Sequence, residues 1–187
     1  MTTPKILIAC KIFFDELRSV LPSSPDLKIV WIDAALHANL DRLEGELKTV
    51  LAQEAVGGAE VQILLGVGCH PDIVKLAKDY GAHLPPIKNC IEAFLGMRQK
   101  ELEKNGTIIM TPGWIRAWPD IMASLGWDEV DVRQNMGRYN RILLLEPGIS
   151  PLTDEEILAF FDLIQVPIDI ETLDLTNFQD VIGSMLG

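Results

Sequence analysis

The chain has 187 residues, of which 48% are hydrophobic, enough to build one sizeable core without help from disulfides or metals. Its 27 acidic and 16 basic residues give a formal net charge of −11, which disfavours nucleic acids and anionic membranes as partners, and no apolar run approaches the ~20 residues that span a bilayer. Three cysteines, an odd number, argue against a secreted disulfide framework and predict a cytoplasmic protein with free thiols or thiolate ligands.

Short β-rich runs alternate with helical periodicity through the first half of the chain. The predicted strands are Lys5–Ala9, Lys28–Ile32 and Val61–Leu65. The predicted helices are Phe14–Leu21, which the turn Pro22-Ser23-Ser24-Pro25 ends, a long helix with Leu40, Leu43, Leu47, Val50 and Leu51 on one face, which Gly57-Gly58 ends, and a helix from Pro71 to Gly81.

The second half continues the same alternation. The predicted strands are a short one near Ala82–Pro85, then Thr107–Met110, Arg141–Leu145 and Pro167–Leu173. The predicted helices are Cys90 to about Leu102, Ile115–Leu125, Glu129–Tyr139, a helix from the Thr153/Glu156 capping box to about Leu163, and Asn177–Leu186.

This alternation predicts an α/β fold with a mainly parallel sheet and helices on both faces, a three-layer arrangement of the Rossmann-like or flavodoxin-like kind. The strands are continuous apolar runs, as expected for parallel strands buried on both faces. Residues 1–187 contain no repeat or linker and are expected to form a single domain. The order of the strands does not follow from the sequence.

Residues with reactive side chains follow the strands of this predicted sheet. In open α/β sheets, ligands bind beyond the carboxyl ends of the strands. Cys10 follows the first strand, Asp33 and His37 follow the second, Cys69 and His70 follow the third, Cys90 follows the segment 84–88, and Trp114 follows Thr107–Met110. All three cysteines and two of the three histidines are therefore expected at one edge of the sheet.

Thiolate and imidazole groups at one edge predict a metal site, most simply for zinc, with Cys10, Cys69, His70, Cys90 and His37 as candidate ligands. The helix that begins at Cys90 would favour its thiolate form. The alternative is that the cysteines are small buried hydrophobic residues, because no CxxC or HExxH motif specifies a metal.

A ligand pocket beside these residues is expected to include Trp114, Asp33 and Arg98, the last as a group that can hold an anion. A nucleotide cofactor is not predicted. Gly66-Val67-Gly68 is followed by Cys69, His70 and Pro71, so the third glycine of a dinucleotide fingerprint is missing. These glycines are better explained by a close turn that presents Cys69 and His70.

Five stretches of the chain follow a known pattern. They are Leu-Ile-Ala-Cys at 7–10, Trp31-Ile32-Asp33 with Leu36-His37, Leu65-Gly66-Val67-Gly68, Asn89-Cys90-Ile91 with Phe94-Leu95-Gly96-Met97-Arg98, and Thr111-Pro112-Gly113-Trp114. Through them the chain resembles the domain-of-unknown-function family 1638 over about residues 5 to 186. Members of that family occur largely in methanogens and other anaerobes, often beside corrinoid methyltransferase systems.

The resemblance implies a part in methyl or corrinoid metabolism, with corrinoid or methyltransferase proteins as partners and a corrinoid not excluded as cofactor. By position it carries over Cys10, His37, Cys90 and Trp114. The sequence departs from the family pattern at Cys69 and His70, where the family tends to have Gly-x-Gly-Leu-Cys-Gly, so the third ligand can be either residue.

Three hypotheses follow. The first is a Cys/His metal site whose open position activates a thiol or a small substrate for methyl transfer. The second is a non-catalytic accessory or binding protein of a methyltransferase or corrinoid system, which would show an apolar surface patch and no convergent polar site. The third is a thiol-redox protein, which needs two cysteines within disulfide reach. Whether the chain is an enzyme does not follow from the sequence.

Overall fold

The computed structural model describes residues 4–21 and 27–187. The predicted turn Pro22-Ser23-Ser24-Pro25 lies outside the described residues. Strands and helices alternate as the sequence predicts, and every strand pairing is parallel. The predicted α/β class is confirmed. No helix in the described part of the chain is both long and apolar enough to cross a membrane.

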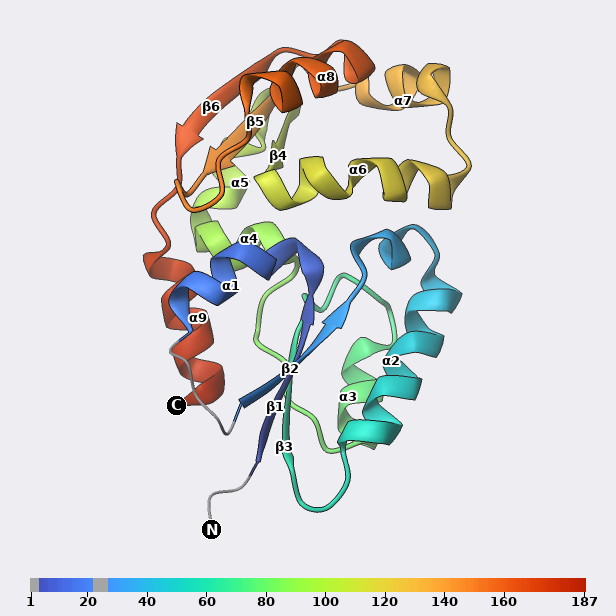
Figure 1. The fold of residues 1–187 in the computed structure, drawn as a ribbon, viewed down its shortest axis with the longest axis vertical. Helices are drawn as coiled ribbons and strands as arrows, with labels where there is room; N and C mark the ends of the chain where they lie inside the picture. Colours follow the sequence, from blue (N-terminus) through green and yellow to red (C-terminus); the bar gives the residue numbers. More distant parts are fainter. Residues whose placement is uncertain (1–3, 22–26) are drawn as a thin grey trace.

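The strands form two three-stranded sheets (Figure 1). The first sheet has the order β2-β1-β3, with β1 (Lys5–Cys10), β2 (Leu27–Ile32) and β3 (Glu60–Leu64). The second has the order β4-β5-β6, with β4 (Thr107–Met110), β5 (Arg141–Glu146) and β6 (Ile168–Thr172). Hydrophobic periodicity identifies strands but not their partners, so the division into two sheets had no signal in the sequence.

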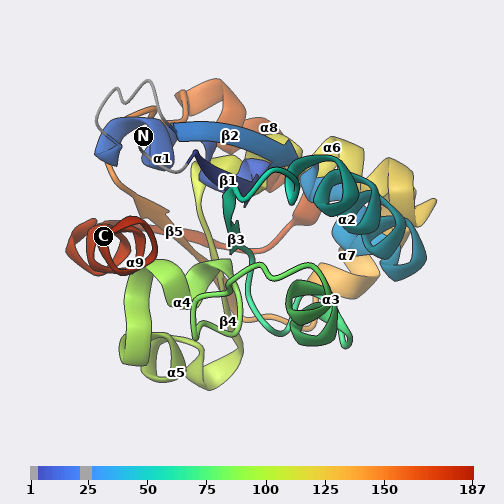
Figure 2. The same ribbon diagram turned by 90° about the horizontal axis from the view of Figure 1, so that it is seen from below.

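Helices flank the first sheet on two sides (Figures 1 and 2). On one side lie α2 (Leu40–Glu54) and α3 (Ile73–Asp79). On the other lie α1 (Phe14–Val20), α4 (Cys90–Leu95) and α9 (Thr176–Leu186). The last helix of the chain thus returns to the first sheet, where the rings of Phe13, Phe94 and Phe178 pack with centroids 4.9–5.5 Å apart.

The helices of the second sheet are α6 (Pro112–Leu125), α7 (Glu129–Met136) and α8 (Asp154–Ile164). In Figure 1, α6 lies between the second sheet and the carboxyl edge of the first. It contacts the 3-10 turns η1 (Lys11–Phe13) and η2 (Ala34–Ala38), which follow β1 and β2. Helix α6 is therefore the element that brings the second half of the chain to the predicted functional edge.

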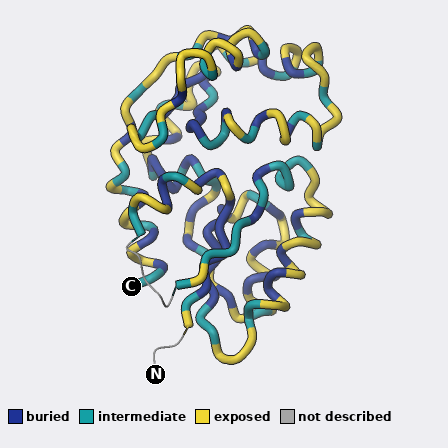
Figure 3. The backbone as a smooth tube through the Cα atoms, viewed as in Figure 1, coloured by how far each residue is buried: buried dark blue, intermediate teal, exposed yellow. Residues whose placement is uncertain are grey.

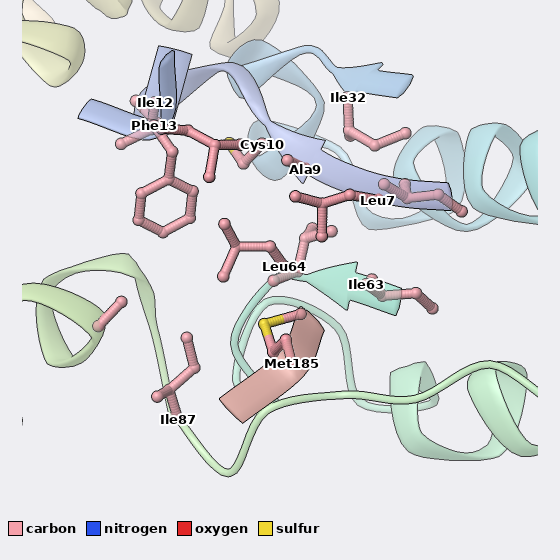
Figure 4. Close-up of a cluster of buried hydrophobic side chains, with 14 of the residues drawn as sticks. Leu7, Ala9, Cys10, Ile12, Phe13, Ile32, Ile63, Leu64, Ile87 and Met185 are labelled. Carbon is pink, nitrogen blue, oxygen red and sulfur yellow. The ribbon is translucent and has the colours of Figure 1, made fainter. Parts of the chain in front are cut away.

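Two clusters of buried side chains form the interior. The first surrounds the first sheet and also includes Ile109, Leu143 and Leu145 of the second sheet. The second contains the alternate residues of β4 and β5, which are Met110, Ile142 and Leu144. Figure 3 shows the burial concentrated along the strands and on the inner faces of the helices. Figure 4 shows Cys10 among the apolar side chains of the first cluster, beside Ala9 and Ile12. Trp114 and Ala117 of α6 pack against both clusters, so the two halves share a continuous apolar contact at this helix.

Three predicted elements differ from the structure. The helix predicted from Cys90 to about Leu102 is interrupted, because Gly96 adopts a φ of +53° and ends α4; a 3-10 turn (Gly96–Arg98) and the short helix α5 (Gln99–Leu102) follow. The strand predicted near Ala82–Pro85 is reduced to a single parallel bridge between Gln62 and His83 at the edge of β3. The helix predicted from Pro71 begins at Ile73.

Candidate functional site

Three backbone segments meet beyond the carboxyl ends of β1 and β3. The segment 87–88 continues alongside β3, and its carbonyl groups accept hydrogen bonds from Val67 and Gly68, each with N···O of 2.8 Å. This pairing places the turn that carries Cys69 next to the start of α4, which carries Cys90. Cys10 ends the neighbouring strand β1.

Glycines make these close backbone contacts possible. A Cβ atom on Gly66 would overlap the carbonyl group of Lys88, and one on Gly68 would lie 2.9 Å from the same oxygen. At the start of α6, a Cβ atom on Gly113 would lie 2.5 Å from the carbonyl oxygen of Ile12. Side chains at these three positions would push the segments apart. The close turn predicted at Gly66 and Gly68 is present and brings Cys69 to the edge, whereas His70, also expected there, is directed to the start of the next helix.

The assembled segments enclose a pocket of about 290 Å³, which we call the thiol pocket. It brings together all three cysteines with His37 and Trp114, which come from five separate places in the chain. Its lining consists of Cys10, Ile12, Phe13, His37, Leu40, Leu65, Gly68, Cys69, Asn89, Cys90 and Trp114. The rule that ligands bind at the carboxyl edge thus predicts its principal polar residues.

Trp114 holds Cys90 in place. Its indole Nε1–H donates a hydrogen bond to the Sγ atom of Cys90 with a distance of 3.1 Å. Asn89 caps α4 by accepting a hydrogen bond from the backbone N–H of Glu92 at 2.9 Å. Cys90 is thus positioned both by the start of its helix and by a side chain from the second half of the chain.

Burial keeps the three thiols protonated. It is the largest cause of the raised pKa of Cys10 and of Cys69. The pKa of Cys90 rises to about 12, again through burial, although the hydrogen bond from Trp114 opposes this. The backbone N–H groups of Cys90 and Ile91 at the helix start lower this pKa, as expected, but burial has the larger effect and the thiol stays protonated. Helix α4 has only six residues, and the loss of hydration outweighs its dipole.

His37 is a neutral imidazole with a defined tautomer. Burial lowers its pKa, and its Nδ1 atom lies 3.1 Å from the carbonyl oxygen of Ala34. Because a carbonyl oxygen only accepts hydrogen bonds, Nδ1 carries the proton and donates it to Ala34. The lone pair on Nε2 is then available to accept a proton or to bind a metal ion.

Three predicted site residues do not line the thiol pocket. His70 is buried, and its Nδ1 atom accepts a hydrogen bond from the backbone N–H of Asp72 at 3.1 Å, so it supports the start of α3. Asp33 accepts hydrogen bonds from Lys11 and from the Ala35 backbone at 2.8 and 3.0 Å.

Arg98 forms an exposed ion pair with Glu171 at 3.1 Å. Sequence reasoning in turn missed Asn89 as part of the pocket, although it lies between a strand-like segment and a helix, as the cysteines do. It also missed the apolar lining residues Ile12, Phe13, Leu40 and Leu65. Their positions at or beyond the carboxyl ends of strands were the signal that could have identified them.

The donor types suit a soft metal, but their positions do not form a coordination site. Within residues 4–21 and 27–187, no group of three or more His, Cys, Asp or Glu side chains is arranged to hold a metal ion. All three cysteines are free thiols. What the thiol pocket offers is a small, mainly apolar cavity with sulfur atoms and one imidazole on its wall.

The sequence also matches a known family. Residues 31–182 match the family described as "Protein of unknown function (DUF1638)". The chain belongs to the DUF1638 family. The match includes His37, Cys69, Cys90 and Trp114 of the thiol pocket. The match confirms the resemblance and leaves the activity of this DUF1638 protein open.

Other comparisons add little. No curated protein matches the sequence significantly. A solved structure titled "Structure of unliganded arylmalonate decarboxylase" aligns with 99% of this chain and 94% of its own, at 15% sequence identity and a TM-score of 0.35. A likeness at that level carries no argument about the site of the DUF1638 protein.

We expect Gly113→Ala to disturb the thiol pocket and to destabilise the protein by about 1–3 kcal/mol, because the new methyl group would collide with the Ile12 carbonyl. Urea unfolding measures the loss of stability, and tryptophan fluorescence reports the displacement of Trp114. The matched control is Gly45→Ala in α2, where a Cβ atom would meet nothing within 4 Å. Equal effects of the two substitutions would contradict the proposed role of Gly113.

The alkylation rate of Cys90 should keep rising about tenfold per pH unit from pH 7 to 10. Its raised pKa leaves the thiol protonated over this whole range, so the reactive thiolate fraction grows without reaching a plateau. Peptide mass spectrometry of protein treated briefly with iodoacetamide measures this rate. In the urea-unfolded chain the rate should level off above the ordinary thiol pKa of ~8.5. A plateau below pH 9 in the folded protein would contradict the burial effect.

Proposed function

We propose that this DUF1638 protein binds a small molecule in the thiol pocket and contacts it through the thiols of Cys69 and Cys90. The convergence of three cysteines from separate segments on one enclosed pocket carries this proposal. Cys10 is accounted for by core packing alone, since it is 3% exposed among apolar neighbours. Cys69 and Cys90 are only half-buried and line the open space.

The lining provides the parts of a thiol reaction. A cysteine reacts as its thiolate, so a proton must leave Sγ as the sulfur bonds to an electrophilic atom of the ligand, and the displaced electron pair leaves with a leaving group or moves onto the ligand from a broken π bond. His37 lines the same pocket as a neutral imidazole and can accept that proton on Nε2. The indole of Trp114 already donates to Cys90 and stabilises negative charge on that sulfur. Cys90 is therefore the thiol that we assign to the contact with the reacting atom.

The proposal predicts that one small molecule protects Cys69 and Cys90 together. Iodoacetamide labelling, measured cysteine by cysteine by mass spectrometry, is repeated across a panel of small molecules. A ligand of the pocket should slow labelling at both positions and raise the melting temperature. Both effects should vanish in Leu40→Trp, because Leu40 lies on the pocket wall, half-exposed, where an indole would fill the space.

The control is Leu158→Trp, an exposed leucine on α8 away from the pocket, which should respond as the wild type does. A ligand that protects the cysteines of Leu40→Trp and raises its melting temperature as much as in the wild type would bind elsewhere, which would contradict the proposal. Labelling of Cys69 and Cys90 only after unfolding would also contradict it.

A soft metal ion, most simply zinc, is the second candidate, and the orientation of His37 favours it. Imidazoles that bind metals usually donate their other N–H to a carbonyl or carboxylate oxygen, as His37 does to Ala34. Cys10, Cys69, Cys90 and His37 would be the ligands, and a bound cation would lower the thiol pKa values. Because these groups are not in coordinating positions, the side chains would have to move together on binding.

Metal content decides this second candidate. Wild-type protein purified without added metal is compared by elemental analysis with the Cys90→Ala variant. The matched control is Leu158→Ala, which keeps all three cysteines. Stoichiometric zinc in the wild type and the control, and its loss in Cys90→Ala, would support a metal site. Metal-free protein in which iodoacetamide still alkylates Cys69 and Cys90 would exclude the metal site and leave the small-molecule site standing.

A role in methyl or corrinoid metabolism, with corrinoid or methyltransferase proteins as partners, stays a prediction from the family resemblance. A pocket thiol is a soft nucleophile and a suitable acceptor for a methyl group, which connects that prediction to the site. The accessory-protein hypothesis is less well supported, because the cysteines do converge on a pocket. The thiol-redox hypothesis predicts that mild oxidation removes two thiols at once, which a thiol titration would detect.

A further inference from the structure

The wall of the thiol pocket is electrically neutral. None of its eleven lining residues, in the part of the chain that the structure describes, is a lysine, arginine, aspartate or glutamate. Its one titratable side chain besides the cysteines is His37, whose lowered pKa leaves the imidazole uncharged at neutral pH. A charged ligand would therefore lose its hydration on entry without gaining a partner of opposite charge.

Charged residues close in sequence to the lining lie outside the pocket. Lys88, directly before Asn89, is exposed and does not line the pocket. Arg116, two residues after Trp114, pairs with Glu156 at 2.9 Å. Lys11, directly after Cys10, pairs with Asp33 at 2.8 Å, and both side chains are about half-exposed. Arg98, eight residues after Cys90, pairs with Glu171. None of these cations lines the pocket beside the thiols.

The backbone N–H groups of Cys90 and Ile91 are directed to the Cys90 sulfur, and those at the start of α6 are also engaged. At the start of α6, the N–H groups of Trp114 and Ile115 both donate to the carbonyl oxygen of Thr111, at 3.0 and 3.2 Å. The indole N–H of Trp114 is used by Cys90. The formal net charge of −11 also repels anions at long range. Anionic ligands are thus disfavoured both on approach and after entry.

We propose that the thiol pocket takes small uncharged organic molecules and excludes carboxylates, phosphates and organic cations. This inference rests on the proposed function and adds the chemical class of the ligand. The side chains of Ile12, Phe13 and Leu65 contact its apolar part, while the thiols of Cys69 and Cys90 face a soft or electrophilic centre. At about 290 Å³ the pocket is at the lower end of the range for organic ligands, so the molecule is small.

Methanethiosulfonate reagents of matched size test this selectivity. In each case the Cys90 sulfur attacks the reagent's thio sulfur, methanesulfinate leaves, a mixed disulfide forms and the thiol proton passes to solvent. The three reagents carry a 2-hydroxyethyl, a 2-sulfonatoethyl or a 2-trimethylammonioethyl group, which are neutral, anionic and cationic. Labelling rates at Cys90 are measured by mass spectrometry and divided by the rates for the urea-unfolded chain. This division removes the intrinsic reactivity of each reagent.

We expect the neutral reagent to label Cys90 at least tenfold faster than either charged reagent after this normalisation. The preference should persist in 0.5 M salt, which screens the net charge of the surface but not a buried pocket. Leu40→Lys places a cation on the pocket wall and should raise the relative rate of the anionic reagent at least threefold. Leu40→Gln, which is similar in size to lysine's inner stem and uncharged, should not.

The outcomes separate the two claims. Equal normalised rates for the three reagents, or a preference that disappears in salt, would overturn the selectivity while leaving the thiol site intact. Failure of all three reagents to label Cys69 and Cys90 in the folded protein would overturn the proposed function itself.

Discussion

The site depends on the close approach of backbones at the carboxyl edge of the first sheet. Gly66 and Gly68 let the turn after β3 lie directly against the carbonyl group of Lys88, and Gly113 lets α6 lie against that of Ile12. The first contact brings the turn that carries Cys69 to the segment that leads to Cys90, and the second brings Trp114 to the turn that follows Cys10. A side chain at any of these positions would collide with the facing carbonyl group and push the segments apart. Backbone proximity is thus the constraint from which the geometry of the thiol pocket follows.

Five of the pocket residues could be predicted from their positions in the sequence. Periodicity located the strands, and the rule for sheet edges then placed Cys10, His37, Cys69, Cys90 and Trp114 together, as they are in the pocket. The same rule included His70, which points to its own helix start instead. The difference between Cys69 and His70 is a single residue in a tight turn. Which of the two side chains enters the pocket depends on the contact of this turn with Lys88, which lies in another segment of the chain.

The ionisation of the thiols was the other property that local sequence did not predict. The start of a helix favours a thiolate by about 0.3–1 kcal/mol, and this was the basis for expecting an ionised Cys90. Burial raises its pKa to about 12, which corresponds to about 4 kcal/mol against ionisation. The larger effect wins. Burial depends on how α4, α6 and the turn after β3 pack together, which no local motif encodes.

A protonated thiol in an uncharged pocket has a consequence for any chemistry at this site. The wall supplies a hydrogen bond from Trp114 and a neutral imidazole, but no fixed positive charge that would hold a thiolate before the ligand arrives. At neutral pH the free protein therefore keeps Cys90 almost entirely protonated, so its sulfur reacts slowly. The stabilisation that ionises Cys90 has to come with the bound species, either as an electrophilic centre that takes up the sulfur's electron pair or as a metal cation. Selectivity and activation are then linked, since a ligand that fits beside Cys69 and Cys90 both occupies the pocket and promotes ionisation of the thiol it contacts.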